Sequence, residues 1–110
     1  MSLFSFDTLQ ENQLEEIAFL AKSLSDVNRL RILLALEKGS TSVSVLVEDL
    51  ELSQPLVSHH LRELRRSLLV SVKRKGPFVY YSLTDEGVIY KIRDLLQLAE
   101  GLLERKSGFG

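Results

Sequence analysis

Apolar residues return every three or four positions over most of the chain, which is the spacing of amphipathic helices. We predict a first helix that is capped by Asp7 and ends near residue 23. A second helix is predicted over residues 26–38, with Ser25 as its cap and Gly39 as its left-handed stop. The N-terminal part of the chain is therefore expected to be helical.

Two short helices follow, joined by a tight turn. The third is predicted over residues 43–50 after its cap Ser42, and the fourth runs from its cap Ser53 to about residue 67. Pro55 is tolerated in the first turn, because the backbone amide that it lacks would have no partner there. Two helices joined so closely must cross steeply.

The pattern changes to alternation from residue 69, which indicates strands. Apolar and aromatic residues lie on both sides of the basic run 73–75 and of Gly76 and Pro77. We therefore predict an antiparallel hairpin over residues 69–83 with a basic tip.

A last helix is predicted over residues 85–105, with Thr84 as its cap. A chain of 110 residues with 45% apolar content is long enough for one buried core and too short for two. We expect a single domain over residues 1–110, disordered at 1–6 and 106–110. The predicted fold class is mainly α with a small antiparallel β-hairpin, a winged helix-turn-helix in which the hairpin is the wing.

The composition restricts the chemistry. The chain has no cysteine, which excludes disulfides, thiolate metal sites and cysteine nucleophiles and suits a reducing cytoplasm. Residues 1–7 carry no basic side chain and apolar runs such as 32–36 are short, so neither secretion nor a membrane span is predicted. Since no catalytic constellation occurs at a recognisable spacing, we expect no enzymatic activity.

The net charge of −1 conceals an asymmetry. Residues 53–81 carry six cations and one acid, Glu63, for a net charge of +5, so the rest of the chain carries −6. The six cations are Arg62, Arg65, Arg66, Lys73, Arg74 and Lys75. A basic segment in an acidic protein can bind DNA if folding gathers its charges on one surface.

The fourth helix has an apolar and a polar face when its residues are placed about 100° apart. The apolar face is formed by Val57, Leu61, Leu64 and Leu68. The polar face carries Pro55, Ser58, His59, Arg62 and Arg66. Its short hydrogen-bonding groups suit base edges and its cations suit phosphates, while Gln54 adds an amide able to pair with adenine. A solvated helix can look the same, but the tight turn and the basic hairpin favour DNA binding.

Three stretches resemble the ArsR/SmtB family of bacterial winged-helix repressors. They are LSQPLVSHHLRELR at 52–65, GPFVYYSL at 76–83 and SLSDVNRLRILLAL at 23–36, in the family's order and spacing. The similarity extends over about residues 20–103. It implies a sequence-specific transcriptional regulator, a repressor that binds double-stranded DNA. A homodimer, which we predict below, would bind an inverted-repeat operator because of its two-fold symmetry.

The resemblance also implies which side chains contact DNA. Gln54, Ser58 and His59 correspond to recognition-helix contacts with bases or phosphates, and the wing contacts with the backbone or minor groove are Lys73, Arg74 and Lys75. Arg62 is added from its place on the helical wheel alone. The chain departs from the family at Leu68, where a glycine is frequent, and at Pro77, where an arginine is frequent.

Metal binding is not predicted. His59 and His60 are adjacent on a helix, so their side chains point about 100° apart and cannot readily chelate one ion. His60 is expected to pack at the edge of the core instead. The family's thiolate site corresponds here to Ser42, Val43 and Ser44, and hydroxyls bind soft metals poorly.

The family's other metal site lies on the last helix, where only Asp85 matches. The remaining places are held by Gly87, Leu98 and Gly101. Further carboxylates on this helix have the pattern of solvated charges, namely Asp94, Glu100 and Glu104. We therefore predict no metal and no cofactor, and the sequence leaves the inducer unidentified.

The first and last helices carry more apolar residues than one subunit needs. In the last helix a wide stripe is formed by Val88, Ile92, Leu95, Ala99 and Leu102. We predict a homodimer whose interface includes Leu14, Ile17, Ala21, Ile92, Leu95, Ala99 and Leu102. In the alternative, the first helix covers this stripe within one subunit.

Two other functions remain open at this point. The same fold can serve as a protein-interaction module, although the basic polar face of the fourth helix argues against this. A sequence-tolerant architectural DNA binder would rely on phosphate contacts and show little preference between sites.

Overall fold

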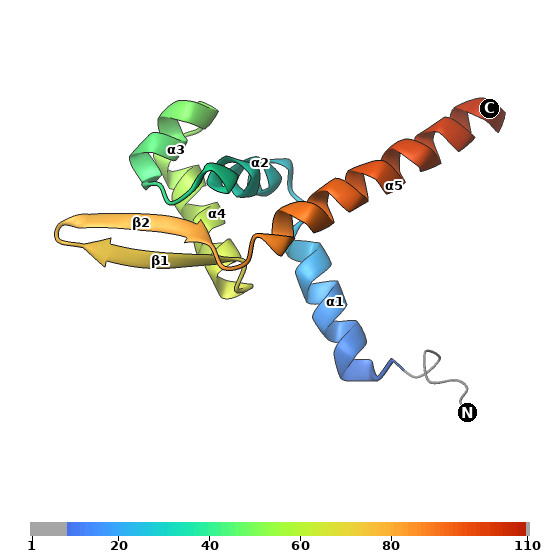
Figure 1. Ribbon diagram of the computed structural model, residues 1–110, viewed down its shortest axis with the longest axis horizontal. Coiled ribbons are helices and arrows are strands. Elements are labelled where there is room, and N and C mark those ends of the chain that lie inside the picture. The colour runs from blue at the N-terminus through green and yellow to red at the C-terminus, as the bar shows by residue number, and fades with distance from the viewer. Residues whose placement is uncertain (1–8, 110) are drawn as a thin grey trace.

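The computed structural model describes residues 9–109, and Figure 1 shows the helices and the hairpin in the predicted order. The elements are α1 (Glu11–Ser23), α2 (Val27–Ala35), the 3-10 turn η2 (Leu36–Lys38), α3 (Val43–Leu50), α4 (Gln54–Arg66), β1 (Val70–Lys75), β2 (Phe78–Leu83) and α5 (Gly87–Phe109). The predicted mainly α winged helix-turn-helix is confirmed.

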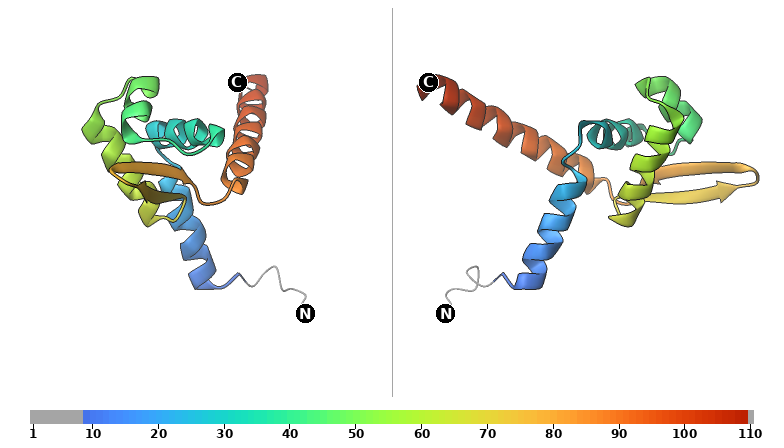
Figure 2. Two further views of the ribbon diagram at one scale, coloured as in Figure 1. Left: turned by 60° about the vertical axis from the view of Figure 1, so that its left-hand side comes forward. Right: turned by 180° about the vertical axis from the view of Figure 1, so that it is seen from behind.

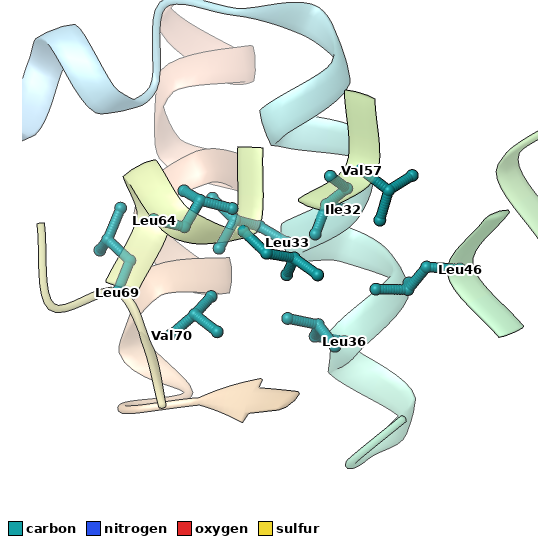
Figure 3. Packing of buried hydrophobic residues seen from close by; sticks show 9 residues of the cluster. Ile32, Leu33, Leu36, Leu46, Val57, Leu64, Leu69 and Val70 are labelled. Carbon is teal, nitrogen blue, oxygen red and sulfur yellow. The ribbon is translucent and has the colours of Figure 1, made fainter. Parts of the chain in front are cut away.

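The core forms around α2, which contacts α3, α4 and α5. Ile32 and Leu33 of α2 are fully buried and lie among leucines and valines of the neighbouring elements (Figure 3). The rest of this cluster comprises Leu36, Leu46, Val57, Leu61, Leu64, Leu69 and Val70. Each large side chain buried in this way contributes about 1.5–3 kcal/mol. The cluster therefore fixes how α3, α4 and the base of the hairpin are arranged.

The hairpin is anchored at its base and free at its tip. β1 and β2 pair antiparallel from Val70 opposite Leu83 to Lys75 opposite Phe78. Tyr81 of β2 forms a β-bridge with Thr41, in which each backbone N–H donates to the other residue's carbonyl, at 2.9 and 2.7 Å. This bridge holds β2 to the segment before α3. The opposite end projects away from the helices (Figure 2).

Two helix starts differ from the prediction. Asp26, not Ser25, caps α2, because its Oδ1 accepts a hydrogen bond from the backbone N–H of Arg29 at 3.1 Å. Ser25 instead donates its hydroxyl to the carbonyl of Lys22 at 2.6 Å and so closes the end of α1. At its other end, α1 begins after Gln10, and the predicted cap Asp7 lies outside the described residues.

The prediction for α5 was wrong at both ends. Thr84 does not cap the helix, because its hydroxyl donates to the carbonyl of Leu68, and Asp85 accepts from the N–H of Gly87 at 2.7 Å instead. The helix continues through Phe109, so residues 106–109 are helical rather than disordered. Extending an existing helix costs little because each added residue gains a hydrogen bond. Residues 1–6 and Gly110 lie outside the described residues.

Leu68 does not extend the apolar face of α4 as predicted. It adopts a left-handed conformation with φ 65° and is 77% exposed. The backbone N–H of Leu69 donates to the carbonyl of Leu64 and that of Leu68 to Arg65, both at 3.0 Å, which is the Schellman pattern of a helix end. Leu68 thus occupies the position where glycine is preferred.

α1 and the distal part of α5 extend away from the core in different directions (Figures 1 and 2). The radius of gyration is 17.2 Å, whereas a compact domain of this length has about 13 Å. No residue of α1 is buried within the described part of the chain, and most of α5 beyond Ile92 is exposed. The alternative in which α1 covers the apolar stripe of α5 within one subunit is therefore wrong.

We expect Leu68→Gly to raise the free energy of unfolding by about 0.5–1 kcal/mol. The left-handed conformation costs a residue with a Cβ about 1–2 kcal/mol, which glycine avoids. Part of this gain is lost because glycine gives up more conformational entropy on folding. Chemical denaturation at fixed protein concentration measures the change. Leu68→Ala is the matched control, since it removes the exposed side chain but keeps the Cβ, and equal stabilisation by both variants would contradict backbone strain as the cause.

Candidate nucleic-acid interface

The turn between α3 and α4 is as short as predicted and is built by local hydrogen bonds. The hydroxyl of Ser42 accepts from the N–H of Val45 at 3.4 Å, and that of Ser53 accepts from Leu56 at 3.3 Å. Between the helices, Glu51 takes a left-handed conformation with φ 54°. Both predicted caps are confirmed, and α4 packs against α3.

Burial of one face of α4 determines what the other face presents. Val57, Leu61 and Leu64 are at most 1% exposed and pack in the core. The side chains that face away include Gln54, Ser58, His59 and Arg62, of which only Ser58 is half-buried. The four candidate readers predicted on this helix therefore share one accessible surface.

Gln54 and Ser58 interact with each other at the start of this surface. The side-chain amide of Gln54 donates to the hydroxyl of Ser58 at 3.2 Å, one turn further along. This contact orients the Gln54 side chain and leaves donors and acceptors of both groups available. Such a preoriented amide suits the paired donor and acceptor of an adenine edge in the major groove.

His60 faces the interior of the domain, as predicted. Its side chain is 6% exposed, and Nε2 lies 3.6 Å from Oδ1 of Asp26. Its Nδ1 is buried without a hydrogen-bond partner in the described part of the chain. Burial lowers the pKa of His60, which the carboxylate of Asp26 opposes in part. The pKa of Asp26 is lowered mainly by the N–H that Arg29 donates to it.

The wing extends the positive charge beyond α4. Lys73, Arg74 and Lys75 are exposed near the tip of the hairpin, and the hairpin residues 70–83 include no acid. Because side chains alternate along a strand, Lys73 and Lys75 share one face and Arg74 lies on the other. The run of three cations gave no reason to separate Arg74 from the two lysines or to single out Phe78, which is exposed beside them.

A second surface is apolar and lies on α1 and α5. On α1 the exposed side chains include Leu14, Ile17, Phe19 and Leu20. On α5 they include Leu95, Leu96, Leu98, Leu102 and Leu103. Ala21 and Ala99 are also exposed, but Ile92 is half-buried and packs against the core of its own subunit. Monomeric proteins rarely expose so much contiguous apolar surface.

Two features of the described residues concern other kinds of site. Nowhere in residues 9–109 do three or more His, Asp or Glu side chains gather in a way that could hold a metal ion. None of the helices in this range is both long and apolar enough to span a membrane.

Two packed helices joined by a tight turn, an accessible polar face on the second and a basic wing define a winged helix-turn-helix regulator of transcription. Residues 26–72 match the family described as bacterial regulatory protein, arsR family. The chain is 36% identical over 90 residues to the arsenical resistance operon repressor of Bacillus subtilis, covering 81% of this chain and 82% of that protein. It belongs to the ArsR family.

Other relatives agree with this assignment. The chain is 35% identical over 89 residues to a transcriptional repressor SmtB homolog of Synechocystis, covering 81% of this chain and 67% of the relative. The structure of HlyU from Vibrio cholerae matches with a TM-score of 0.71 and 35% identity, over 81% of this chain and 97% of that one. A homodimeric winged helix-turn-helix DNA-binding domain from Mycobacterium bovis matches with a TM-score of 0.75 and 25% identity, over 84% and 86% of the two chains.

We expect the protein to lose stability as the pH falls from about 7.5 to 5.5, and His60→Gln to reduce this loss. A histidine with a lowered pKa in the folded state binds fewer protons there than in the unfolded chain. The free energy of unfolding therefore falls as the pH drops below the ordinary value of 6.5 and towards the folded pKa. The lowered pKa of Asp26 makes the free energy of unfolding depend on pH only below the ordinary aspartate pKa of 3.8.

Denaturation midpoints of the wild type and of His60→Gln at several pH values give this comparison. An identical slope for wild type and His60→Gln would show that the burial of His60 does not govern it.

Proposed function

We propose that this protein is a transcriptional repressor that binds an inverted-repeat operator as a homodimer, with the whole chain acting as one DNA-binding domain. The observation that carries the proposal is the accessible polar and cationic face of α4 next to a wing with three cations and no acid. Two of the relatives described above are named as repressors, and one structural neighbour is described as homodimeric.

The proposal gives the side chains of α4 two tasks. Gln54, Ser58 and His59 lie in the first half of the helix and are proposed to read base edges in the major groove. Arg62 lies one turn beyond Ser58 and is proposed to bind phosphate. The wing residues Lys73, Arg74 and Lys75 add backbone or minor-groove contacts, which supply affinity through counterion release.

Dimerisation is proposed to use the apolar surface of α1 and α5. A groove of about 570 Å³ runs between these helices, lined on one side by Ile17, Leu20 and Ala21 and on the other by Leu95 and Leu98. Leu14, Ala99 and Leu102 extend the same surface, and a two-fold partner would cover it. Such a dimer would place its recognition helices about 34 Å apart, one turn of DNA, which requires an inverted repeat.

We also propose that the effector is not a soft metal bound at the family's site on α3. The hydroxyl of Ser42 caps this helix and lies 3.1 Å from that of Ser44, so both oxygens are engaged in local hydrogen bonds. Hydroxyl oxygens are weak ligands for soft ions in any case. The proposal assigns the chain no catalytic role.

We expect Gln54→Ala or His59→Ala to weaken binding to the preferred duplex by about 1–3 kcal/mol and to leave non-specific binding nearly unchanged. These side chains are proposed to read bases, so their loss matters only where the correct bases are present. The duplex is selected from a random pool with the wild type, and affinities for it and for random DNA are compared.

Arg62→Ala is the control for this comparison, because loss of a phosphate contact weakens binding to both DNAs alike and lowers the salt dependence. If Gln54→Ala and His59→Ala behave as Arg62→Ala does, the base-reading role is wrong. An architectural binder would show no preference in the wild type, and a protein-interaction module would not bind either duplex.

We expect Leu95→Glu combined with Leu102→Glu to produce monomers and to lower operator affinity at least tenfold, because single half-sites bind much more weakly than paired ones. Both leucines are about half exposed, so the fold of the subunit should survive. Sedimentation and DNA titration measure the two effects. Leu68→Glu places one such charge on an exposed leucine outside α1 and α5 and should stay dimeric. A wild type that is monomeric at micromolar concentration would refute the proposal.

A further inference from the structure

The two faces of the wing differ in chemistry. The register places Lys73 opposite Tyr80 and Lys75 opposite Phe78, so these four side chains share one face. The other face carries Arg74 with Tyr81 and Leu83, and the latter two pack against the core. The face with two lysines and two aromatic rings therefore points away from the core.

Phe78 is the more exposed of the two aromatic rings on this face. Its side chain is 60% exposed, although an aromatic ring of this size is normally buried. It begins β2 directly after the two-residue turn of Gly76 and Pro77, so it lies at the end of the hairpin that projects from the molecule (Figure 2). No element of the described chain covers it.

Its neighbours hold it in place and surround it with positive charge. The rings of Phe78 and Tyr80 lie 6.4 Å apart between centroids, at an angle of 43°. The ammonium of Lys75 lies 5.9 Å from the centroid of the Tyr80 ring, within the range of a cation–π interaction. An exposed ring beside cations, on a hairpin without an acid, is complementary to a polyanion with apolar surfaces between its charges.

We propose that Phe78 is a wedge that the wing inserts into the minor groove of duplex DNA, where it contacts a base step and bends the duplex. This inference rests on the proposed function and adds a residue that acts through DNA deformation. A phenyl ring offers no hydrogen bond to a base edge, so its contribution must come from apolar contact and partial unstacking. Lys73 and Lys75, on the same face, would bind the flanking phosphates.

The position of Phe78 fits this role better than a role in folding. Apolar wedges that kink DNA are carried by elements that already follow the minor groove. The energy needed to unstack a base step is lower where that step is flexible. The wedge would therefore give the protein a preference for pyrimidine–purine steps at the place that the wing contacts. This preference would be independent of the bases read by Gln54 and His59.

The test compares wild type, Phe78→Ser and Phe78→Leu on the duplex that the wild type selects from a random pool. Dyes at the two ends of the duplex report its bend by energy transfer, and titration gives the affinity. We expect Phe78→Ser to bend the duplex less and to bind it about tenfold more weakly, as expected for one lost aromatic contact with a base. Phe78→Leu keeps an apolar side chain and should retain most of both effects.

The salt dependence separates a wedge from a lost charge. Because Phe78 is neutral, the slope of log affinity against log salt should be the same in wild type and Phe78→Ser. Wild-type bending and affinity in Phe78→Ser would overturn the inference while leaving the proposed function intact. If Phe78→Ser changed the oligomeric state and left the bending of the duplex unchanged, the inference would also be overturned, since Phe78 would then contact the partner subunit. A wild type without preference for any duplex would overturn both the proposed function and the wedge.

Discussion

The packing of α4 on α2 is the contact on which the rest of the structure depends. Ile32 and Leu33 meet Val57, Leu61 and Leu64 in the most deeply buried part of the molecule. Since a helix has one orientation about its axis, burying this face of α4 determines which side chains point to solvent. The polar surface is therefore a consequence of core packing, and no loop has to position it. A site carried by a packed helix is held more rigidly than one carried by a loop.

α2 also holds the other helices through polar contacts at its edges. Arg29 donates to the carbonyls of Ser23 and Lys22 at 2.7 and 2.9 Å, which ties the end of α1 to α2. Arg31 donates to the carbonyl of Leu50 at 2.8 Å and satisfies the end of α3. These contacts use carbonyls that a helix leaves without partners at its C-terminus. One nine-residue helix thus supplies the centre of the core and the caps of two neighbours.

The sequence predicted best what local interactions decide. The caps Ser42 and Ser53 satisfy amides three residues away, so both were predicted correctly. The faces of α4 follow from helical periodicity and were predicted correctly up to the end of the helix, beyond which Leu68 is exposed. The choice between Ser25 and Asp26 is also local, since Ser25 bonds to Lys22 and Asp26 to Arg29, each three residues away, and either residue type can cap a helix. The partner of Thr84 is the carbonyl of Leu68, which comes near only when the hairpin folds. The placement of Phe78 and Tyr80 on the same face as Lys73 and Lys75 depends on the register of the hairpin, which a two-residue turn fixes.

The extended shape follows from where α1 and α5 are attached. α5 joins the core only through its first turns, where Ile89 is buried and Arg93 binds the carboxylate of Glu37 at 2.9 Å. α1 is attached at its C-terminal end by Arg29. Because exposed ion pairs contribute little energy, apolar burial around Ile89 does most to fix the direction of α5. In a dimer formed through these helices, the spacing of the two recognition helices would depend on these attachments. A small rotation at the base of α5 would therefore move a partner subunit bound to this helix by a large distance, although α4 itself would not change.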